Sequence, residues 1–249
     1  MGTKATYKHP YTRGFLKYYD NVSLGEGGEC LQVVCPITIY DDFTGVAVDA
    51  TNDWVKSIVN SSTFAPVAGE HGGIARITTG AADDDDMEVS TSLCFKASAG
   101  IGMETRIATG DIANTAMNIG FTDAVTEAAD LLAFTFATTV LTNTADDAAL
   151  FFTDKDATTN LLRFAASKAT TASAITTGTL PVDGAFHVYR VEIDSSGNIA
   201  AYYDGALFAS VSAGITITDP LCAYIGLINR EAFANTLDVD YIRVWSLSR

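Results

Sequence analysis

The sequence predicts an all-β protein, built as a sandwich or barrel of short antiparallel strands. Thr, Ala, Gly, Val and Ile are abundant and only 5 of the 249 residues are proline, a composition that favours sheet over helix. Turn-forming residues recur roughly every ten positions between short alternating runs, which is typical of all-β sandwiches and barrels. The run 236–245 alternates with a period of two and is rich in β-branched and aromatic residues. It predicts a strand in the middle of a sheet.

The first 38 residues differ from the rest and predict an extended N-terminal arm. Their first nineteen positions hold four cations and four tyrosines and no acidic residue. Such a segment buries little of itself, whereas tyrosines are large amphipathic anchors suited to an interface. We therefore predict a docking arm over 1–38 and a β-sandwich domain over 39–249; the alternative is a frayed terminus with incidental charges. The predicted partner-binding residues are Tyr7, Lys8, Tyr11, Arg13, Lys17, Tyr18 and Tyr19.

Alternating runs predict the strands of the sandwich in order. A turn at 195–198 separates two such runs, which predicts a hairpin over 187–208. One short Ala-rich stretch, 123–132, is the rival helix. The predicted strands cover 39–45, 72–80, 87–95, 103–108, 117–122, 133–139, 149–153, 160–165, 187–194, 199–203, 223–229 and 236–245.

Side-chain parity predicts which residues of a strand face the core, because successive side chains point to opposite faces of a sheet. In the closing run, Leu237, Val239 and Tyr241 share one parity and Ile242 and Val244 share the other. In the run 87–95, the core-facing parity holds Met87, Val89, Leu93 and Phe95.

The hairpin and the closing run also carry a family resemblance. The segments are His-Val-Tyr-Arg-Val-Glu-Ile-Asp at 187–194, Gly-Asn at 197–198, Tyr-Tyr-Asp-Gly at 202–205 and Val-Asp-Tyr-Ile-Arg-Val-Trp at 239–245. Together with Asp-Asp-Phe-Thr-Gly at 41–45 they resemble the concanavalin A-like lectin/glucanase superfamily, which includes laminin-G-like domains. The resemblance implies a jelly roll of two antiparallel sheets packed face to face.

Charge and apolar patterning exclude several classes of function. The net charge of −15 argues against a nucleic-acid partner. The absence of an apolar run of roughly 18 residues argues against a membrane-spanning helix. We see no secretory signal, so we expect synthesis in the host cytoplasm and reduced thiols at the four cysteines, 30, 35, 94 and 222, whose spacing does not form a zinc site.

Three carboxylates are the candidate catalytic residues. In the glucanase branch of the superfamily, a Glu-x-Asp-x-(x)-Glu strand places its carboxylates on one face of a concave cleft, and retaining hydrolysis uses two of them. Here the matching residues are Asp84, Asp86 and Glu88. Asp84 stands where the family has Glu, and the run 83–86 is equally typical of a solvated acidic turn. We therefore predict that the protein is not an enzyme.

The resemblance also implies a structural calcium. No other cofactor is expected to be required. In glucanase-like members an Asp of the closing strand and the carbonyl of an early Gly are ligands, which correspond here to Asp240 and Gly73. Oxygen ligands on an acidic protein suit Ca²⁺. The alternative is that Asp240 pairs with Arg243 or is solvated.

Taken together, these features predict a non-enzymatic virion structural protein. Its Thr/Ala/Gly-rich sequence resembles bacteriophage structural proteins, and we expect a capsid decoration protein on the capsid surface. The expected partners are the major capsid protein or another virion protein, and further copies of the chain in a homo-oligomer. The alternatives are a carbohydrate-binding module that binds a glycan on its concave sheet, and a glycoside hydrolase that acts on β-glucans.

Overall fold

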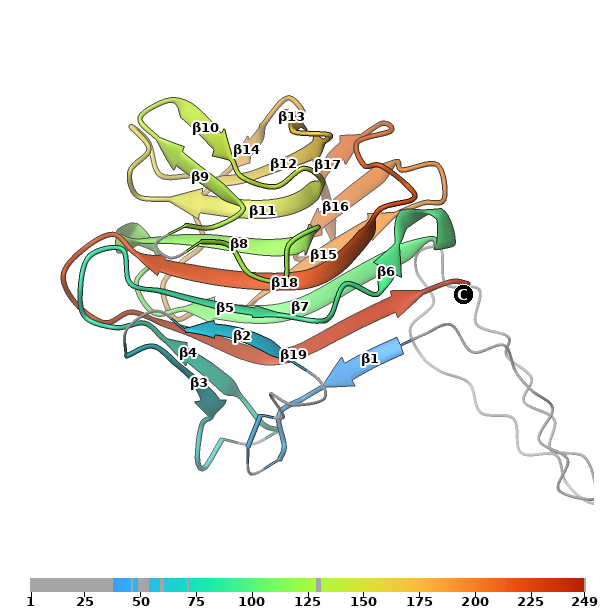
Figure 1. Cartoon of the computed structure of the whole chain (residues 1–249). Coiled ribbons are helices and arrows are strands. Elements are labelled where there is room, and N and C mark those ends of the chain that lie inside the picture. The colour runs from blue at the N-terminus through green and yellow to red at the C-terminus, as the bar shows by residue number, and fades with distance from the viewer. Residues whose placement is uncertain are drawn as a thin grey trace, which may run out of the picture.

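The computed structural model describes residues 38–45, 47–48, 54–58, 61–70, 72–128 and 131–248. Two large antiparallel sheets stack face to face and a two-stranded sheet lies beside them (Figure 1). Helical structure in the described ranges is limited to the short 3-10 segments η1 (Ala97–Ala99) and η2 (Ile112–Asn114), and no helix there is long and apolar enough to cross a membrane. The predicted all-β jelly-roll sandwich is thereby confirmed.

The first large sheet, called sheet A, contains the closing strand in its interior. This strand, β19, pairs with β7 along one edge and with β4 and β1 along the other, as the position of the run 236–245 predicted. The strands of sheet A are, in spatial order, β17 (Ala206–Val211), β16 (Ile199–Tyr203), β15 (His187–Ile193), β7 (Ile101–Thr109), β19 (Thr236–Ser246), β4 (Ala75–Thr78) and β3 (Thr63–Pro66), with β1 (Thr38–Asp41) on β19.

The second large sheet, sheet B, has β8 and β18 in its interior. Its strands are, in order, β13 (Thr171–Ala172), β12 (Leu162–Lys168), β11 (Ala148–Asp154), β8 (Thr115–Thr122), β18 (Pro220–Asn229), β5 (Asp86–Ser90) and β2 (Val55–Ile58), with β14 (Thr176–Gly178) on β12 and β6 (Phe95–Lys96) on β18. The small sheet consists of β9 (Phe134–Ala137) and β10 (Val140–Asn143).

The main apolar core fills the space between the two large sheets. Alternation puts every second side chain of each strand into it, and aromatic rings from both sheets meet there. The Phe151 ring of sheet B lies 5.1 Å from Phe164 in the same sheet and 5.4 Å from Tyr189 of sheet A, both edge to face. Such edge-to-face pairs add to the stabilisation that burial provides. The interleaved rings fix the spacing of the two sheets.

A second apolar core lies on the other face of sheet B. There the described residues of the segment 123–147, namely 123–128 and 131–147 with the small sheet, pack across β8, β11 and β18. The Phe134 and Phe152 rings, one from each side, are 5.5 Å apart and edge to face, and Tyr224 of β18 is fully buried beneath the segment. We call the segment 123–147 the cover. Sheet B is therefore buried on both faces in its interior.

Two local predictions are corrected by the structure. A β-bulge between Val239 and Tyr241 changes the parity of the closing strand, so that Ile242 joins Val239 in the core while Tyr241 points outward. A bulge adds one residue to a strand and therefore shifts every later side chain to the other face. The predicted single parity through Tyr241 is wrong for this reason.

The predicted strand 87–95 is in fact two strands. Pairing ends at Ser90, and the chain bends before β6 begins at Phe95. Leu93 consequently lies in the bend and is 41% exposed, whereas Phe95 is buried. The rival helix at 123–132 does not form in the residues described there, which are bends and coil of the cover.

The predicted hairpin over 187–208 is confirmed, and its turns explain its register. Asp194 Oδ1 accepts hydrogen bonds from the backbone N–H groups of Ser196 and Asn198, at 2.8 and 2.9 Å. The second turn uses Asp204 and Gly205 with φ of 47° and 79°, the left-handed conformations that a two-residue hairpin turn requires. Short polar turns thus set the pairing of β15, β16 and β17.

Strands β8 and β11 approach each other so closely at Gly120 that a larger residue does not fit there. Gly120 has φ of 148°, and a Cβ there would lie 2.1 Å from the carbonyl oxygen of Ala149. We expect Gly120→Ala to lower the free energy of unfolding in urea by about 3 kcal/mol, because the backbone must move apart. Gly205→Ala is the matched control: its φ is also positive but its Cβ would meet nothing within 4 Å, so it should cost roughly 1 kcal/mol. Equal losses in both variants would contradict the prediction.

Candidate functional site

Strand β5 presents its carboxylates to the cover. Met87 and Val89 point into the main core, so the alternate residues Asp86 and Glu88 lie on the outer face of sheet B. Both are buried, at 1% exposure. The strand begins only at Asp86, and Asp84 precedes it in a turn with φ of 65°. All three carboxylates would share one strand face only if the strand extended to Asp84; it does not, so only Asp86 and Glu88 share that face.

Glu88 is held by two donors from different parts of the chain. The Tyr224 hydroxyl donates to Glu88 Oε1 at 2.5 Å, and the backbone N–H of Glu127 donates to both carboxyl oxygens, at 3.1 and 2.9 Å. Burial raises the pKa of Glu88 to about 7, and the bonds from Tyr224 and Glu127 only partly offset that effect. The Glu127 side chain adds a like charge close by, and burial raises its pKa as well.

The cover is fastened to sheet B by polar contacts as well as by apolar packing. The Ser90 hydroxyl donates to the Val125 carbonyl oxygen at 2.6 Å. The Asn118 side chain bonds the backbone of Phe134 twice, as donor to its carbonyl and acceptor from its N–H, both at 2.8 Å. These bonds join two separate parts of the cover to β5 and β8. The face that would form the concave cleft of a glucanase is closed over Glu88 by the protein itself.

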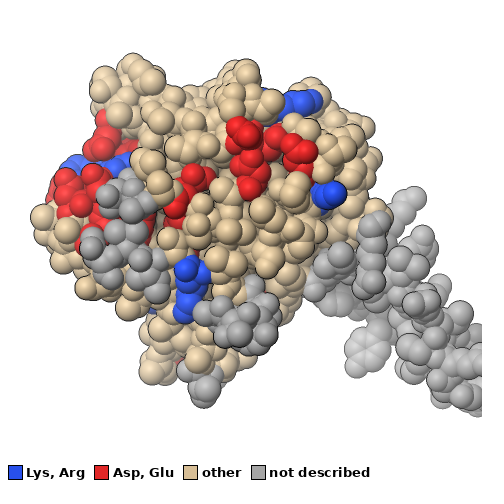
Figure 2. Space-filling model, in the orientation of Figure 1, with Lys and Arg blue, Asp and Glu red and all other residues tan. Residues whose placement is uncertain are grey.

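Asp84 belongs to a different group of charges, at the end of sheet B. Arg230 follows β18 and forms an ion pair with Asp84; its Nε lies 3.2 Å from Asp154 Oδ1 and 3.5 Å from Asp156 Oδ2. Only 9% of the Arg230 side chain is exposed. Desolvation lowers its pKa, but the carboxylates outweigh this and raise it. Figure 2 shows acidic and basic side chains gathered at the left end of this face, where β5 begins and β18 ends in Figure 1.

The arrangement sets chemical limits on these carboxylates. Retaining hydrolysis needs two carboxyl groups about 5–5.5 Å apart on either side of a bound sugar. Here Asp84 is paired with Arg230, while Glu88 accepts hydrogen bonds from Tyr224 and from the backbone of Glu127. A raised carboxyl pKa is typical of a general acid, but it also follows from burial alone. In the conformation described, no sugar reaches Glu88.

Of the two predicted calcium ligands, Asp240 forms an ion pair and Gly73 packs closely against a neighbouring loop. Asp240 Oδ2 lies 2.6 Å from Arg106 Nη1, so its pairing partner is Arg106 where Arg243 was the alternative. Gly73 packs against the backbone of Asp42, since a Cβ on it would lie 2.1 Å from that carbonyl oxygen. The part of the chain that is described holds no group of three or more His, Cys, Asp or Glu side chains suited to a metal. Calcium at Asp240 stays a prediction, and its remaining ligands would be carbonyls and water.

The predicted partner-binding residues lie outside the described ranges. They are Tyr7, Lys8, Tyr11, Arg13, Lys17, Tyr18 and Tyr19.

Sequence reasoning missed Tyr224, Glu127 and Arg230. A signal for the cover was available: 221–228 is an unbroken apolar run, and such a run in a strand indicates burial on both faces. What covers the second face is not visible in a local pattern, because Tyr224 and Glu88 are 136 positions apart in the chain.

The raised pKa of Glu88 predicts how stability depends on pH. A folded-state pKa of about 7 against a model value of 4.5 means that the folded protein holds a proton that the unfolded chain releases. The stabilisation is complete below pH 4.5 and is lost as the pH rises to 7, by up to about 3 kcal/mol. We expect Glu88→Gln, which keeps the acceptor oxygen and removes the charge, to flatten this slope and to be more stable than the wild type at pH 8. The free energy of unfolding, measured in urea at a series of pH values from 4 to 8, checks this prediction.

The matched control is Glu70→Gln at an exposed carboxylate, which should keep the wild-type slope. A Glu88→Gln variant with the wild-type slope would show that Glu88 is not the group responsible.

Calcium removal tests Asp240. An ion that binds only the native state raises the melting temperature by mass action, so a structural calcium predicts a lower melting temperature in EDTA. Asp240→Ala should abolish the sensitivity to EDTA. If EDTA left the melting curve of the wild-type protein unchanged, the prediction of a structural calcium would be wrong.

The chain is similar to known proteins in structure but not in sequence. No protein-family model and no curated protein matches the sequence. Solved structures match over most of the chain. The carbohydrate recognition domain of Emp47p has a TM-score of 0.59 at 10% identity and covers 86% of this chain and 98% of its own.

Two further matches are similar in extent. The GH16 protein of the Bacteroides ovatus mixed linkage glucan PUL, in complex with a G4G4G3G product, has a TM-score of 0.56 at 11% identity and covers 83% of this chain and 99% of its own. A protein of unknown function from Shewanella oneidensis MR-1 has a TM-score of 0.57 at 10% identity, with coverage of 87% and 90%. Likeness at this level of identity shows the fold alone. The chain therefore shares the jelly-roll β-sandwich fold of these structures.

Proposed function

We propose that this protein is a non-enzymatic structural component of a bacteriophage virion, a decoration protein on the capsid surface. The observation that carries the non-enzymatic part is the covered face of sheet B. Glu88 is buried beneath the cover and bonded to Tyr224 and Glu127. A polysaccharide would have to displace the cover and break up the second apolar core before it reached this carboxylate. With this face of sheet B covered, the surfaces available for binding a partner are the other outer surfaces of the domain.

The attachment part of the proposal rests on charge. The chain has a net charge of −15, yet its first nineteen residues hold four cations and no acid. Cation–carboxylate pairs across an interface steer encounter, while tyrosines supply contact area. The arm would dock on the major capsid protein, on another virion protein or on the acidic body of a neighbouring copy, which would also make the protein a homo-oligomer.

Removal of the arm tests this proposal. Deletion of residues 2–20 takes away all seven predicted partner-binding residues and leaves the described sandwich intact. We expect an unchanged melting temperature, together with weaker self-association in sedimentation velocity and weaker co-sedimentation with empty capsids of the same phage. Added salt should weaken attachment of the full-length protein, because exposed ion pairs are screened.

The control replaces Lys8, Arg13 and Lys17 with Gln and keeps every tyrosine. It should lose the salt dependence and retain part of the binding. Full assembly and attachment by the truncated protein would refute the docking role of the arm.

The second candidate is a carbohydrate-binding module, which the fold likeness to a carbohydrate recognition domain favours. In the closed conformation such a module would use a surface other than the covered face. A glycan array with the full-length protein separates the candidates: specific binding that survives deletion of residues 2–20 would favour the module. Hydrolysis of laminarin-type β-glucan that Glu88→Gln abolishes would favour a glycoside hydrolase over both.

A further inference from the structure

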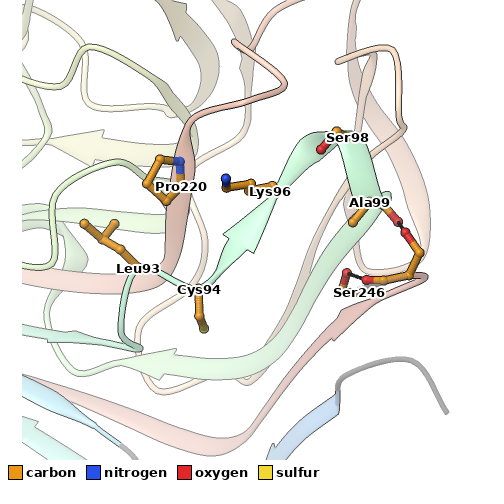
Figure 3. A pocket seen from close by; sticks show the side chains of 8 residues that line it. Leu93, Cys94, Lys96, Ser98, Ala99, Pro220 and Ser246 are labelled. Carbon is orange, nitrogen blue, oxygen red and sulfur yellow. Dashed lines mark hydrogen bonds between the residues drawn. The ribbon is translucent and has the colours of Figure 1, made fainter. Parts of the chain in front are cut away.

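A pocket opens at one end of the sandwich, where the two sheets meet (Figure 3). It measures about 660 Å³, within the range of roughly 300–1,000 Å³ that is typical of small-molecule sites. Its lining comes from the bend before β6, from β6 and η1, from the start of β18 and from the end of β19. Both sheets therefore contribute side chains to one opening.

Lys96 gives the pocket a positive charge. It is the single charged side chain among the described residues that line the pocket, and it is exposed. No ion pair or hydrogen bond joins its ammonium group to another described residue, whereas Lys155 pairs with Glu231 at 2.6 Å. The chain has 30 acidic and 15 basic residues. A pocket that holds a cation and no carboxylate in such a chain favours an anionic ligand.

Serine hydroxyls add hydrogen-bonding groups beside that charge. Ser98 lines the pocket and is exposed, and its hydroxyl has no partner among the residues that the structure describes, so it can both donate and accept. Ser246 Oγ donates to the Ser248 carbonyl oxygen at 2.7 Å, which uses its hydrogen and leaves its oxygen as an acceptor. These groups match the hydroxyls of a polar ligand.

Apolar carbon surface lies next to these polar groups. Leu93 is 41% exposed, Pro220 is exposed as well, and both line the pocket. Figure 3 shows the Lys96 side chain extending across the opening toward Pro220. A ligand that combines a negative charge, hydroxyl groups and a face of C–H groups would use all three kinds of surface, because its apolar face leaves water as its polar groups are bonded.

We propose that this pocket binds a sugar acid, a pyranose ring that carries a carboxylate. The carboxylate pairs with the Lys96 ammonium group, and the ring hydroxyls bond with Ser98 and Ser246. The C–H face of the ring rests on Leu93 and Pro220. A neutral sugar leaves Lys96 unpaired and a simple carboxylate leaves the serines unused, so both should bind more weakly. This inference goes beyond the proposed function and is independent of it, because neither residues 2–20 nor the cover takes part.

Protection of Cys94 tests the proposal in the full-length chain, with sodium D-glucuronate as the probe. Cys94 lines the pocket and is exposed, so a bound sugar acid should shield it from iodoacetamide. A saturation-transfer NMR titration gives the dissociation constant. At about four times that concentration, glucuronate should slow alkylation of Cys94 about fivefold, because about one fifth of the pockets stay empty. Peptide mass spectrometry reads the rate, and Cys222, at 0% exposure, should stay unreactive throughout.

Variants and competing probes identify the groups that bind. Lys96→Gln removes the charge from an exposed side chain and should weaken glucuronate binding about tenfold, since a charge-assisted bond is lost. Lys168→Gln is the matched control at an exposed lysine outside the pocket and should leave the dissociation constant unchanged. D-glucose and acetate should each bind about tenfold more weakly than glucuronate. Absence of protection by glucuronate, equal binding of glucose or acetate, or an unchanged dissociation constant in Lys96→Gln would overturn the proposal.

Discussion

Burial of sheet B on both faces is the constraint on which the rest of the structure depends. All eight residues of β8 and all seven of β11 are buried. One side of these strands meets sheet A through the main core, and the other meets the cover through the second core. Strand β11 is mainly apolar on both faces, and such a strand is unstable with either face in water. The cover is therefore part of the folded unit, and the carboxylates beneath it take their properties from that burial.

The magnitudes show why the cover stays closed over an acidic residue. The shift of the Glu88 pKa from 4.5 to about 7 corresponds to about 3 kcal/mol against the charged form. The cover buries Leu132, Phe134 and Phe136, and full burial of each such side chain contributes about 2 kcal/mol. Apolar packing thus outweighs the desolvation of one carboxyl group. That pKa already includes the hydrogen bonds from Tyr224 and Glu127, which offset part of the effect of burial.

Because the cover closes the outer face of sheet B, the charged side chains that meet solvent lie on the other surfaces of the molecule. In the described ranges, Arg76 and Arg106 on the outer face of sheet A each hold an Asp of β19 at 2.6 Å. At the acidic end of sheet B, Arg230 pairs with Asp84 and Asp154. Charges are paired locally while the chain as a whole keeps a large negative excess. A net charge of this size gives the protein a negative field that attracts cations and repels other acidic surfaces.

The sequence by itself determined the fold class, most strands and the hairpin at 187–208, because alternation and turn residues are local signals. It could not show the bulge before Tyr241, which reverses parity within one strand, nor that the small sheet packs on β11. It also could not show that Glu88 meets Tyr224 and that Asp84 meets Arg230, pairs that are 136 and 146 positions apart. Tertiary structure decided the candidate site, because the environment of a carboxylate depends on which distant strands and loops pack against it.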